Sequence, residues 1–183
     1  MALKPFNLEA GEIPRYTYED YKLWEGNWEL IKGYPYAMSP SPNRKHQGIG
    51  KNLISYFDKL LSETTIDCNC EVFYELDWIM NEETVVRPDI MIICGKFETD
   101  FLTFAPTFIV EISSGSTKMK DRNTKFRLYE SAGVKYYLIA DTEKENVEIF
   151  ELIENQYKQN DSLQLFQLTN SCSIKINTTN LWH

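Results

Sequence analysis

Residues 87–93 read RPDIMII and residues 108–111 read FIVE, and these two stretches decide the fold. Each contains an unbroken apolar run, which is typical of a strand buried on both faces. The polar segment between them, residues 95–105, can reverse the chain. If the two strands pair antiparallel about the middle of that segment, Asp89 at the start of the first faces Glu111 at the end of the second. The sequence therefore predicts two carboxylates side by side at one sheet edge.

Two neighbouring carboxylates repel each other unless a positive charge lies between them. An oxygen-only ligand set suits Mg²⁺, with Mn²⁺ as a substitute. Asp89 follows a proline and could simply cap the entry to a strand. Glu111 resists that explanation, because it directly follows three apolar residues, and a charge in a central strand is seldom without a partner. We therefore expect Asp89 and Glu111 to be metal ligands.

The bulk properties are those of a globular protein. The chain has 183 residues, of which 43% are hydrophobic and 25% charged, so we expect one domain over residues 1–183. Apolar runs of membrane-spanning length and a signal-peptide pattern are both missing from the sequence, so we expect a cytoplasmic protein without a membrane partner. The net charge of −8 counts against a general nucleic-acid binder, whose affinity rests on neutralising phosphates.

The four cysteines are Cys68, Cys70, Cys94 and Cys172. The first two form a C-x-C too short for a usual zinc knuckle, and neither a second pair nor a histidine cluster accompanies them. Cys94 ends an apolar strand, which predicts a buried thiol. We expect no disulfide framework, in keeping with a reducing compartment.

The remaining pattern predicts a mixed sheet flanked by helices, an α/β (α+β) fold. A short helix is expected after an N-cap at Thr17, and a long amphipathic helix is expected to run to Ser62 from a cap at Ser41 or Asn43. Strands are expected at 28–31 and 34–38, joined at Lys32–Gly33, at 72–80 with a turn leading back into 85–86, and at 134–140, 147–150, 163–168 and 174–176. The last three extend the sheet or make a small second one.

A helix from about Thr117 to Ala132 is expected to join the Glu111 strand to the strand at 134–140. Such a crossover makes the two strands parallel. Basic residues crowd into this helix directly after Glu111. Runs of this kind are usually a solvated helix face, but this one lies beside the predicted site. Candidate phosphate contacts are Arg44, Lys45, Lys118, Lys120 and Arg122.

Arg87-Pro88-Asp89, Glu111 on the next strand and a nearby lysine resemble the PD-(D/E)XK nuclease superfamily. More narrowly, the chain is similar to the Uma-two family of restriction-endonuclease-like proteins over roughly residues 17–150. Each matching motif is weak alone, and their order and spacing together make the match specific. The matching pieces are Glu29-Leu30-Ile31-Lys32-Gly33, His46, 86–90, 106–113, Asp121 with Lys125 and Tyr129, and 133–137.

The resemblance implies a restriction-endonuclease-like core, Mg²⁺-dependent hydrolysis of a nucleic-acid phosphodiester, and a homodimer. Asp89, Glu111 and Lys125 would then be catalytic. The general superfamily pattern places lysine two residues after the second acid, where this chain has Ser113. In the Uma-two family that lysine has moved to the following helix, which maps it to Lys125. Possible accessory residues are Glu29, His46 and Ser113.

Several of these residues have ordinary explanations. Asp121 lies four residues before Lys125, the favourable order for a solvated helical ion pair. Lys118 and Lys120 compete with Lys125 for the catalytic role. His46 shares an apolar helix stripe and could be a satisfied core histidine, and a glutamate such as Glu29 on a hairpin is usually on the surface.

Two functions therefore remain open. The first is a metal-dependent endonuclease acting on DNA, favoured by Asp89, Glu111 and Lys125. The second is a catalytically silent nuclease-fold domain that binds nucleic acid or a partner protein, favoured by the acidic charge and Ser113. A hydrolase acting on sugars through a carboxylate pair lacks support, because the sequence has no aromatic-rich groove pattern.

Overall fold

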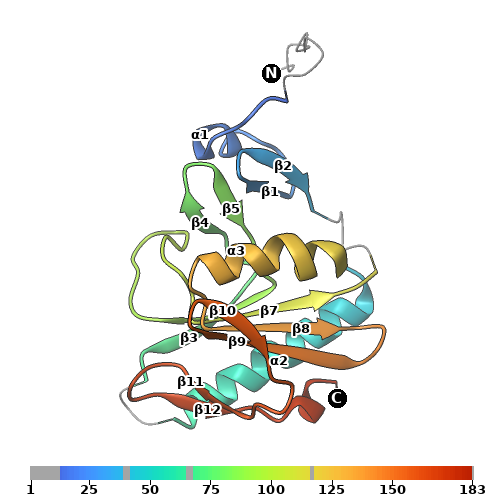
Figure 1. Ribbon diagram of the computed structural model, residues 1–183, viewed down its shortest axis with the longest axis vertical. Coiled ribbons are helices and arrows are strands. Elements are labelled where there is room, and N and C mark those ends of the chain that lie inside the picture. Colours follow the sequence, from blue (N-terminus) through green and yellow to red (C-terminus); the bar gives the residue numbers. More distant parts are fainter. Residues whose placement is uncertain (1–12, 39–41, 65–67, 116–117, 183) are drawn as a thin grey trace.

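The structure is a computed structural model that describes residues 13–38, 42–64, 68–115 and 118–182 (Figure 1). The predicted cap at Ser41 and helix start at Thr117 lie outside these residues. In chain order the elements are α1 (Tyr18–Tyr21), β1 (Trp28–Ile31), β2 (Tyr34–Ala37), α2 (Arg44–Ser62), β3 (Cys70–Tyr74), β4 (Trp78–Asn81), β5 (Thr84–Val86), β6 (Ile90–Cys94), β7 (Phe108–Ser113), η1 (Lys120–Lys125), α3 (Phe126–Ser131), β8 (Tyr136–Asp141), β9 (Asn146–Ile153), β10 (Gln156–Gln159), β11 (Leu165–Gln167), β12 (Ser173–Lys175) and η2 (Thr178–Leu181).

A mixed six-stranded sheet in the order β10-β9-β8-β7-β6-β3 forms the centre. β6 and β7 are antiparallel, with Ile90 opposite Val110 and Ile92 opposite Phe108. This is the register predicted from the sequence, and it brings Asp89, just before β6, level with Glu111. β8 runs parallel to β7, as the crossover rule predicts.

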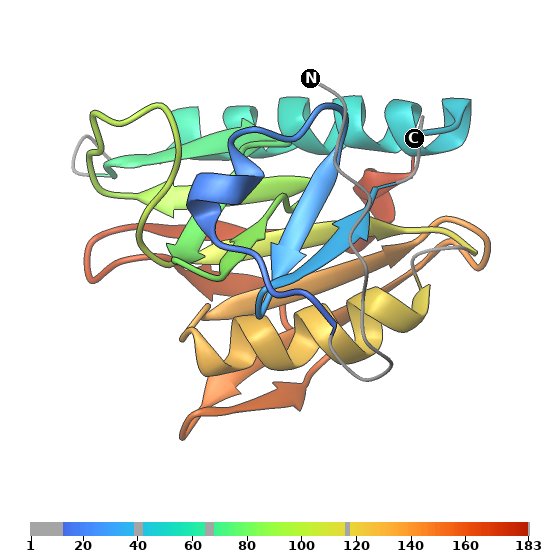
Figure 2. The ribbon, with the colours of Figure 1, turned by 90° about the horizontal axis from the view of Figure 1, so that it is seen from above.

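The sheet is buried on both faces, which explains the unbroken apolar runs. Figures 1 and 2 show α3 over one face and α2 over the other. Alternate residues of β7 divide between the two sides: Val110 packs in the core with α2, and Ile109 packs in the core with Tyr129 of α3. Glu111 is in step with Ile109, so its side chain points toward the α3 face.

The two N-terminal helices begin at the predicted caps. The side chain of Asn43 accepts a hydrogen bond from the N–H of His46, which fixes the start of α2. Thr17 and Asp20 form a capping box at α1. The cap of α2 matters for function, because His46 lies one turn into this helix.

A four-stranded sheet in the order β2-β1-β5-β4 packs beyond the α3 face of the larger sheet. The predicted hairpin of β1 and β2 is confirmed. The prediction of one strand over residues 72–80 is wrong, because the chain breaks at Glu75, which has a positive φ of 49°. β3 before the break belongs to the six-stranded sheet and β4 after it to the smaller one. An alternating pattern cannot show that its two halves pair with different sheets.

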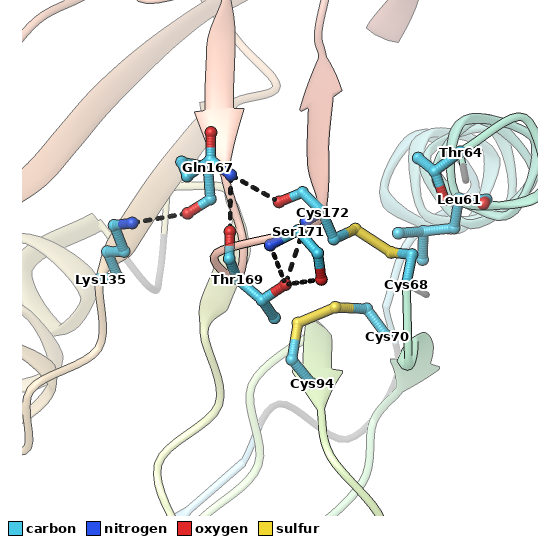
Figure 3. Close-up of a disulfide and its surroundings, with 10 residues drawn as sticks. All are labelled: Leu61, Thr64, Cys68, Cys70, Cys94, Lys135, Gln167, Thr169, Ser171 and Cys172. Atoms are coloured by element: carbon cyan, nitrogen blue, oxygen red, sulfur yellow. Dashed lines mark hydrogen bonds between the residues drawn. A yellow bond between two sulfur atoms is a disulfide. The ribbon is translucent and has the colours of Figure 1, made fainter. Parts of the chain in front are cut away.

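The prediction that the cysteines form no disulfides is wrong. Cys68 is bonded to Cys172, and Cys70 is bonded to Cys94 across the β3–β6 pair (Figure 3). The first bond joins residues 104 positions apart, a proximity that local sequence does not contain. It ties the β11–β12 hairpin to the start of β3. That hairpin supplies Phe166 and Ile174 to the core beneath α2.

The predicted α+β fold, a mixed sheet with helices on both sides and additional C-terminal strands, is confirmed. The C-terminal segments do both things that the sequence allowed: β9 and β10 extend the sheet, and β11 and β12 form a separate hairpin. Within the part of the chain that the structure describes, a helix able to cross a bilayer is not found.

We expect Leu53→Ala to lower the free energy of unfolding by about 2–5 kcal/mol, because Leu53 is fully buried between α2 and the sheet and its truncation leaves a cavity. Urea unfolding followed by circular dichroism measures the change. Ser55→Ala on the exposed side of α2 is the matched control and should shift stability by less than about 0.5 kcal/mol. Equal losses in both variants would contradict the assigned helix face.

Candidate metal-binding active site

Glu111 is buried at the end of β7, with 3% of its surface exposed. Its Oε1 accepts hydrogen bonds from Lys125 Nζ at 2.8 Å and from the Tyr129 hydroxyl at 2.7 Å. Both donors come from the helical segment that lies over this face of the sheet. A carboxylate so far from water requires such partners, since unpaired burial of a charge costs several kcal/mol.

Glu29 reaches the same place from β1, in the smaller sheet. It is fully buried, and its Oε1 lies 3.1 Å from Lys125 Nζ and accepts the backbone N–H of Arg87 at 3.0 Å. Its Oε2 pairs with Lys120. The ordinary expectation of a surface glutamate is therefore wrong for Glu29, which belongs to the same ion cluster as Glu111.

Asp89 stands between β5 and β6, where the chain passes from the smaller sheet to the larger. Its Oδ2 accepts the backbone N–H of Ile112, the residue after Glu111, at 2.6 Å. His46 Nε2 of α2 lies 3.4 Å from the same oxygen. The pairing of β6 with β7 therefore fixes Asp89, and His46 faces the site and is not simply a core residue.

The segment that carries Lys125 is π-helical over Lys120–Lys125 before it continues as α3. Wide turns of this kind are frequent at functional sites. The Tyr137 hydroxyl donates to the carbonyl of Asp121 at 3.0 Å and so satisfies a buried backbone acceptor in the wide turn. Lys125 is only 4% exposed, which excludes the alternative of a solvated ion pair with Asp121.

The pKa values follow from burial and charge. Burial raises the pKa of Glu111 well above its ordinary value; Lys125 opposes this rise and Asp89 adds to it. Burial disfavours the ammonium of Lys125, but Glu111 and Glu29 outweigh it and hold the pKa of Lys125 well above its ordinary value. Lys125 is therefore charged. A further cation near Glu111 would favour the ionised form of the Glu111 carboxylate.

The site opens into a cavity of about 310 Å³, whose lining includes Asp89, Glu111, Asp121, Lys120, Lys125 and His46. With Glu29 behind them, the carboxylates in this group outnumber the lysines. Their oxygens are hard ligands of the kind that Mg²⁺ and Mn²⁺ select. The donor set and the excess negative charge therefore fit a divalent cation held by Asp89 and Glu111.

The other predicted residues are less central. Ser113 is fully buried on β7 and does not line the cavity. The lysine that the superfamily pattern places two residues after Glu111 is therefore replaced by Lys125, which lines the cavity from the helix. Lys45 pairs with Glu145 and Lys118 with Asp141, and Arg122 pairs with Glu148, all on or beside the β8–β9 turn. Arg44 is exposed at the start of α2. Of the five candidate phosphate contacts, Lys120 alone lines the cavity.

Sequence reasoning placed Tyr129 among the residues that match the family without a role of its own, and it did not detect the Asp77–Arg87 ion pair. Tyr129 follows Lys125 by four residues, a spacing that puts both on one helix face and could have linked the tyrosine to Glu111. Arg87 Nε lies 2.6 Å from Asp77 Oδ1, which holds the segment before Asp89. Local sequence carries no signal for that pair, because Asp77 lies on the far side of a hairpin.

The fold of this chain has a solved counterpart. A crystal structure titled a putative nuclease belonging to DUF820, from Anabaena variabilis, superposes with a TM-score of 0.73 over 91% of this chain and 97% of that chain. At 15% identity the likeness concerns the fold, which is that of a nuclease-type protein.

The family model described as "Putative restriction endonuclease" matches residues 18–174, and the chain belongs to this Uma2 (Uma-two) family. An uncharacterized protein of Synechocystis sp. is 27% identical over 182 residues, which cover 91% of this chain and 93% of that protein. The family resemblance found in the sequence is confirmed.

We expect Asp141→Ala to lower the free energy of unfolding by about 1.5–3 kcal/mol at neutral pH, since Asp141 Oδ1 accepts the N–H groups of Glu143 and Lys144. Burial alone would raise the pKa of Asp141, but the N–H of Lys144 and the Lys118 ammonium outweigh it and lower this pKa. The stabilisation is therefore complete above the ordinary aspartate pKa of about 3.9 and is lost as the pH falls through the lower folded value.

Urea unfolding from neutral pH down to about pH 3 measures this, and the deficit of Asp141→Ala should shrink only below about pH 4. Asp58→Ala, at an exposed position of α2, is the control and should show little deficit at any pH. A deficit that does not change with pH would mean that the ionised carboxylate is not its source.

We expect Tyr129→Phe to lower the free energy of unfolding by about 1–3 kcal/mol, because the buried Glu111 then loses one of its two donors. The phenyl ring keeps the stacking on Trp78, so packing is conserved. Tyr16→Phe, at a half-buried tyrosine of the N-terminal segment, is the matched control. Chemical denaturation of both variants measures the free energy of unfolding. Similar losses in both would mean that the Tyr129 hydroxyl does not stabilise Glu111.

Proposed function

We propose that this protein is a metal-dependent endonuclease that hydrolyses phosphodiester bonds of nucleic acid, with DNA as the first candidate substrate. One observation carries the proposal: a buried, charged lysine contacts Glu111 beside Asp89 in a cavity rich in carboxylates. A domain without chemistry gains little from this arrangement, because buried ions stabilise a fold weakly or not at all. The family and the solved neighbour, both described as nucleases, support the same reading.

Asp89 and Glu111 would hold the divalent cation, Mg²⁺ or Mn²⁺, between the start of β6 and the end of β7. When bound, such an ion polarises a phosphate oxygen and lowers the pKa of a water molecule that attacks phosphorus. The backbone N–H of Ile112 keeps Asp89 in place for this role, and the Tyr129 hydroxyl does the same for Glu111.

Lys125 brings a positive charge that persists at neutral pH to the wall of the cavity. A fixed charge of this kind stabilises the negative charge that develops on the phosphate oxygens in the transition state, at no cost of reorganisation. Glu29 holds Lys125 from the other side and so aims its ammonium. His46 is placed beside Asp89, where it can contact substrate or orient the carboxylate.

The protein as a whole is acidic, so attraction to nucleic acid would have to be local. Lys120 and Arg87 line the cavity, and Arg44 is exposed near its rim at the start of α2. Lys45, Lys118 and Arg122 would reach phosphates only by leaving their acidic partners. We therefore propose weak general affinity and recognition that depends on the metal at the cleavage site. The homodimer implied by the family also stays a proposal.

The alternative is a catalytically silent nuclease-fold domain that binds nucleic acid or a protein partner. The ion pairs of Lys45, Lys118 and Arg122 favour the protein-binding form of this alternative, because paired cations attract phosphates less strongly. Ser113 at the usual lysine position favours it too. The two functions differ in whether the carboxylates bind metal and support turnover.

We expect the purified protein to nick supercoiled plasmid with Mg²⁺ or Mn²⁺ and to lose this activity in EDTA. Glu111→Gln, Asp89→Asn and Lys125→Met should each lower the rate at least about 100-fold, the loss typical of removing one group that stabilises a transition state. Glu111→Gln keeps an acceptor for Lys125 and Tyr129, so folding is disturbed little. Calorimetric titration with Mn²⁺ should show binding that the first two variants weaken.

Asp58→Asn, on the exposed side of α2, carries the same chemical change as Asp89→Asn away from the site and should cleave like the parent protein. Single-stranded DNA and RNA offered in parallel decide the substrate. Absence of both metal binding and cleavage would favour the silent alternative, and cleavage that persists in Glu111→Gln would remove this site as its source.

A further inference from the structure

The four cysteines of this chain gather at one place at the far end of β6 from Asp89 (Figure 3). Cys70 begins β3 and Cys94 ends β6, so they face each other across two neighbouring strands. Cys68 precedes β3 by two residues, and Cys172 lies in the turn between β11 and β12. The sulfur atoms of Cys68, Cys70 and Cys172 all lie within 4.8 Å of one another, and Cys94 is bonded to one of them.

This is a ligand set of four sulfurs. Zinc in structural sites takes four thiolates in a tetrahedron with Zn–S bonds of about 2.3 Å, which places neighbouring sulfurs about 3.8 Å apart. Once the disulfides are opened, the sulfurs of Cys68, Cys70 and Cys172, already within 4.8 Å of one another, need to move only slightly to meet this geometry. Cys94, which faces Cys70 across the β3–β6 pair, supplies the fourth sulfur. The C-x-C spacing is too short for a zinc knuckle, which takes a pair of ligands from one loop. Here the ligands come from separate segments of the chain, so that spacing rule does not apply.

The backbone around the cluster is already ordered. Gly95 donates its N–H to the carbonyl of Asn69, so the neighbouring pair Cys70 and Cys94 is the narrow, non-hydrogen-bonded kind, with its side chains close together. The Thr169 hydroxyl oxygen accepts the N–H groups of Ser171 and Cys172, which fixes the turn that carries Cys172. Cys70 and Cys172 are buried, whereas Cys68 and Cys94 are partly exposed and give solutes access.

We propose that, when its thiols are reduced, this chain binds one Zn²⁺ through Cys68, Cys70, Cys94 and Cys172. The ion would fasten the β11–β12 hairpin to the β3–β6 edge of the large sheet, as the two disulfides do in the oxidised chain. The site is separate from the carboxylate site in both position and chemistry, because thiolates select zinc and carboxylates select magnesium or manganese. It does not depend on the proposed nuclease function.

The disulfide form is converted to the zinc form by a balanced reaction. A phosphine reductant gives two electrons to each disulfide, breaks the S–S bond and leaves as the phosphine oxide with an oxygen from water, and the two protons of that water complete two thiols. Zn²⁺ then binds the four sulfurs as thiolates, and the four thiol protons pass to the buffer.

The test uses the full chain, reduced with a phosphine, freed of excess reductant without air and titrated with Co²⁺. We expect intense thiolate-to-cobalt charge-transfer absorption that saturates at one equivalent per chain and disappears when Zn²⁺ displaces the cobalt. Zn²⁺ should also raise the Tm of the reduced chain, because it binds the folded form. If reduction loosens the fold, the same titration still reports the site, since metal binding then drives folding.

Cys68→Ser/Cys172→Ser removes two ligands and should abolish both the absorption and the Tm shift. Ser171→Ala, next to Cys172, is the matched control and should keep both. Glu111→Gln should also keep both, which separates this site from the carboxylates. A reduced chain without charge-transfer absorption, or absorption that survives loss of Cys68 and Cys172, would overturn the proposal.

Discussion

Lys125 is the centre of an ion cluster that connects the two sheets. Its ammonium lies between Glu111 of the six-stranded sheet and Glu29 of the four-stranded sheet, in a place that water scarcely reaches. Removing Lys125 would leave Glu111 buried without a charged partner, which costs about 3–5 kcal/mol. The cluster therefore joins the two sheets and the helical segment that carries Lys125. The buried charges compensate one another only while all three elements keep their positions.

The helix that supplies Lys125 does so by departing from regular α-helical geometry. A wide π-turn over Lys120–Lys125 lets Lys120, Asp121 and Lys125 all line one cavity. The helix then continues regularly, so Tyr129 follows Lys125 on the same side and reaches Glu111. A lysine two residues after Glu111 would arrive from the strand itself. Here Ser113 fills that position, and the helix supplies the charge from above the sheet.

Much of this could be predicted from the sequence. The apolar runs before and after residues 95–105 predicted the two buried strands, and pairing them about the middle of the segment between them predicted the β6–β7 register. The site pair Asp89 and Glu111 follows from that register. What local pattern could not show was pairing between distant segments: the break at Glu75, the Asp77–Arg87 ion pair and the disulfide between Cys68 and Cys172 all depend on contacts made only after folding.

β6 links the two proposed metal sites. Asp89 immediately precedes its first residue and Cys94 is its last, so the strand separates them by roughly 17 Å, at about 3.4 Å per residue. Its middle residues Met91 and Ile92 are fully buried, one toward each face, which makes the strand a stiff spacer. Hard oxygen ligands at one end and sulfur ligands at the other would select different ions. Oxidation at the sulfur end can therefore change how the C-terminal hairpin is held without altering the carboxylates of Asp89 and Glu111.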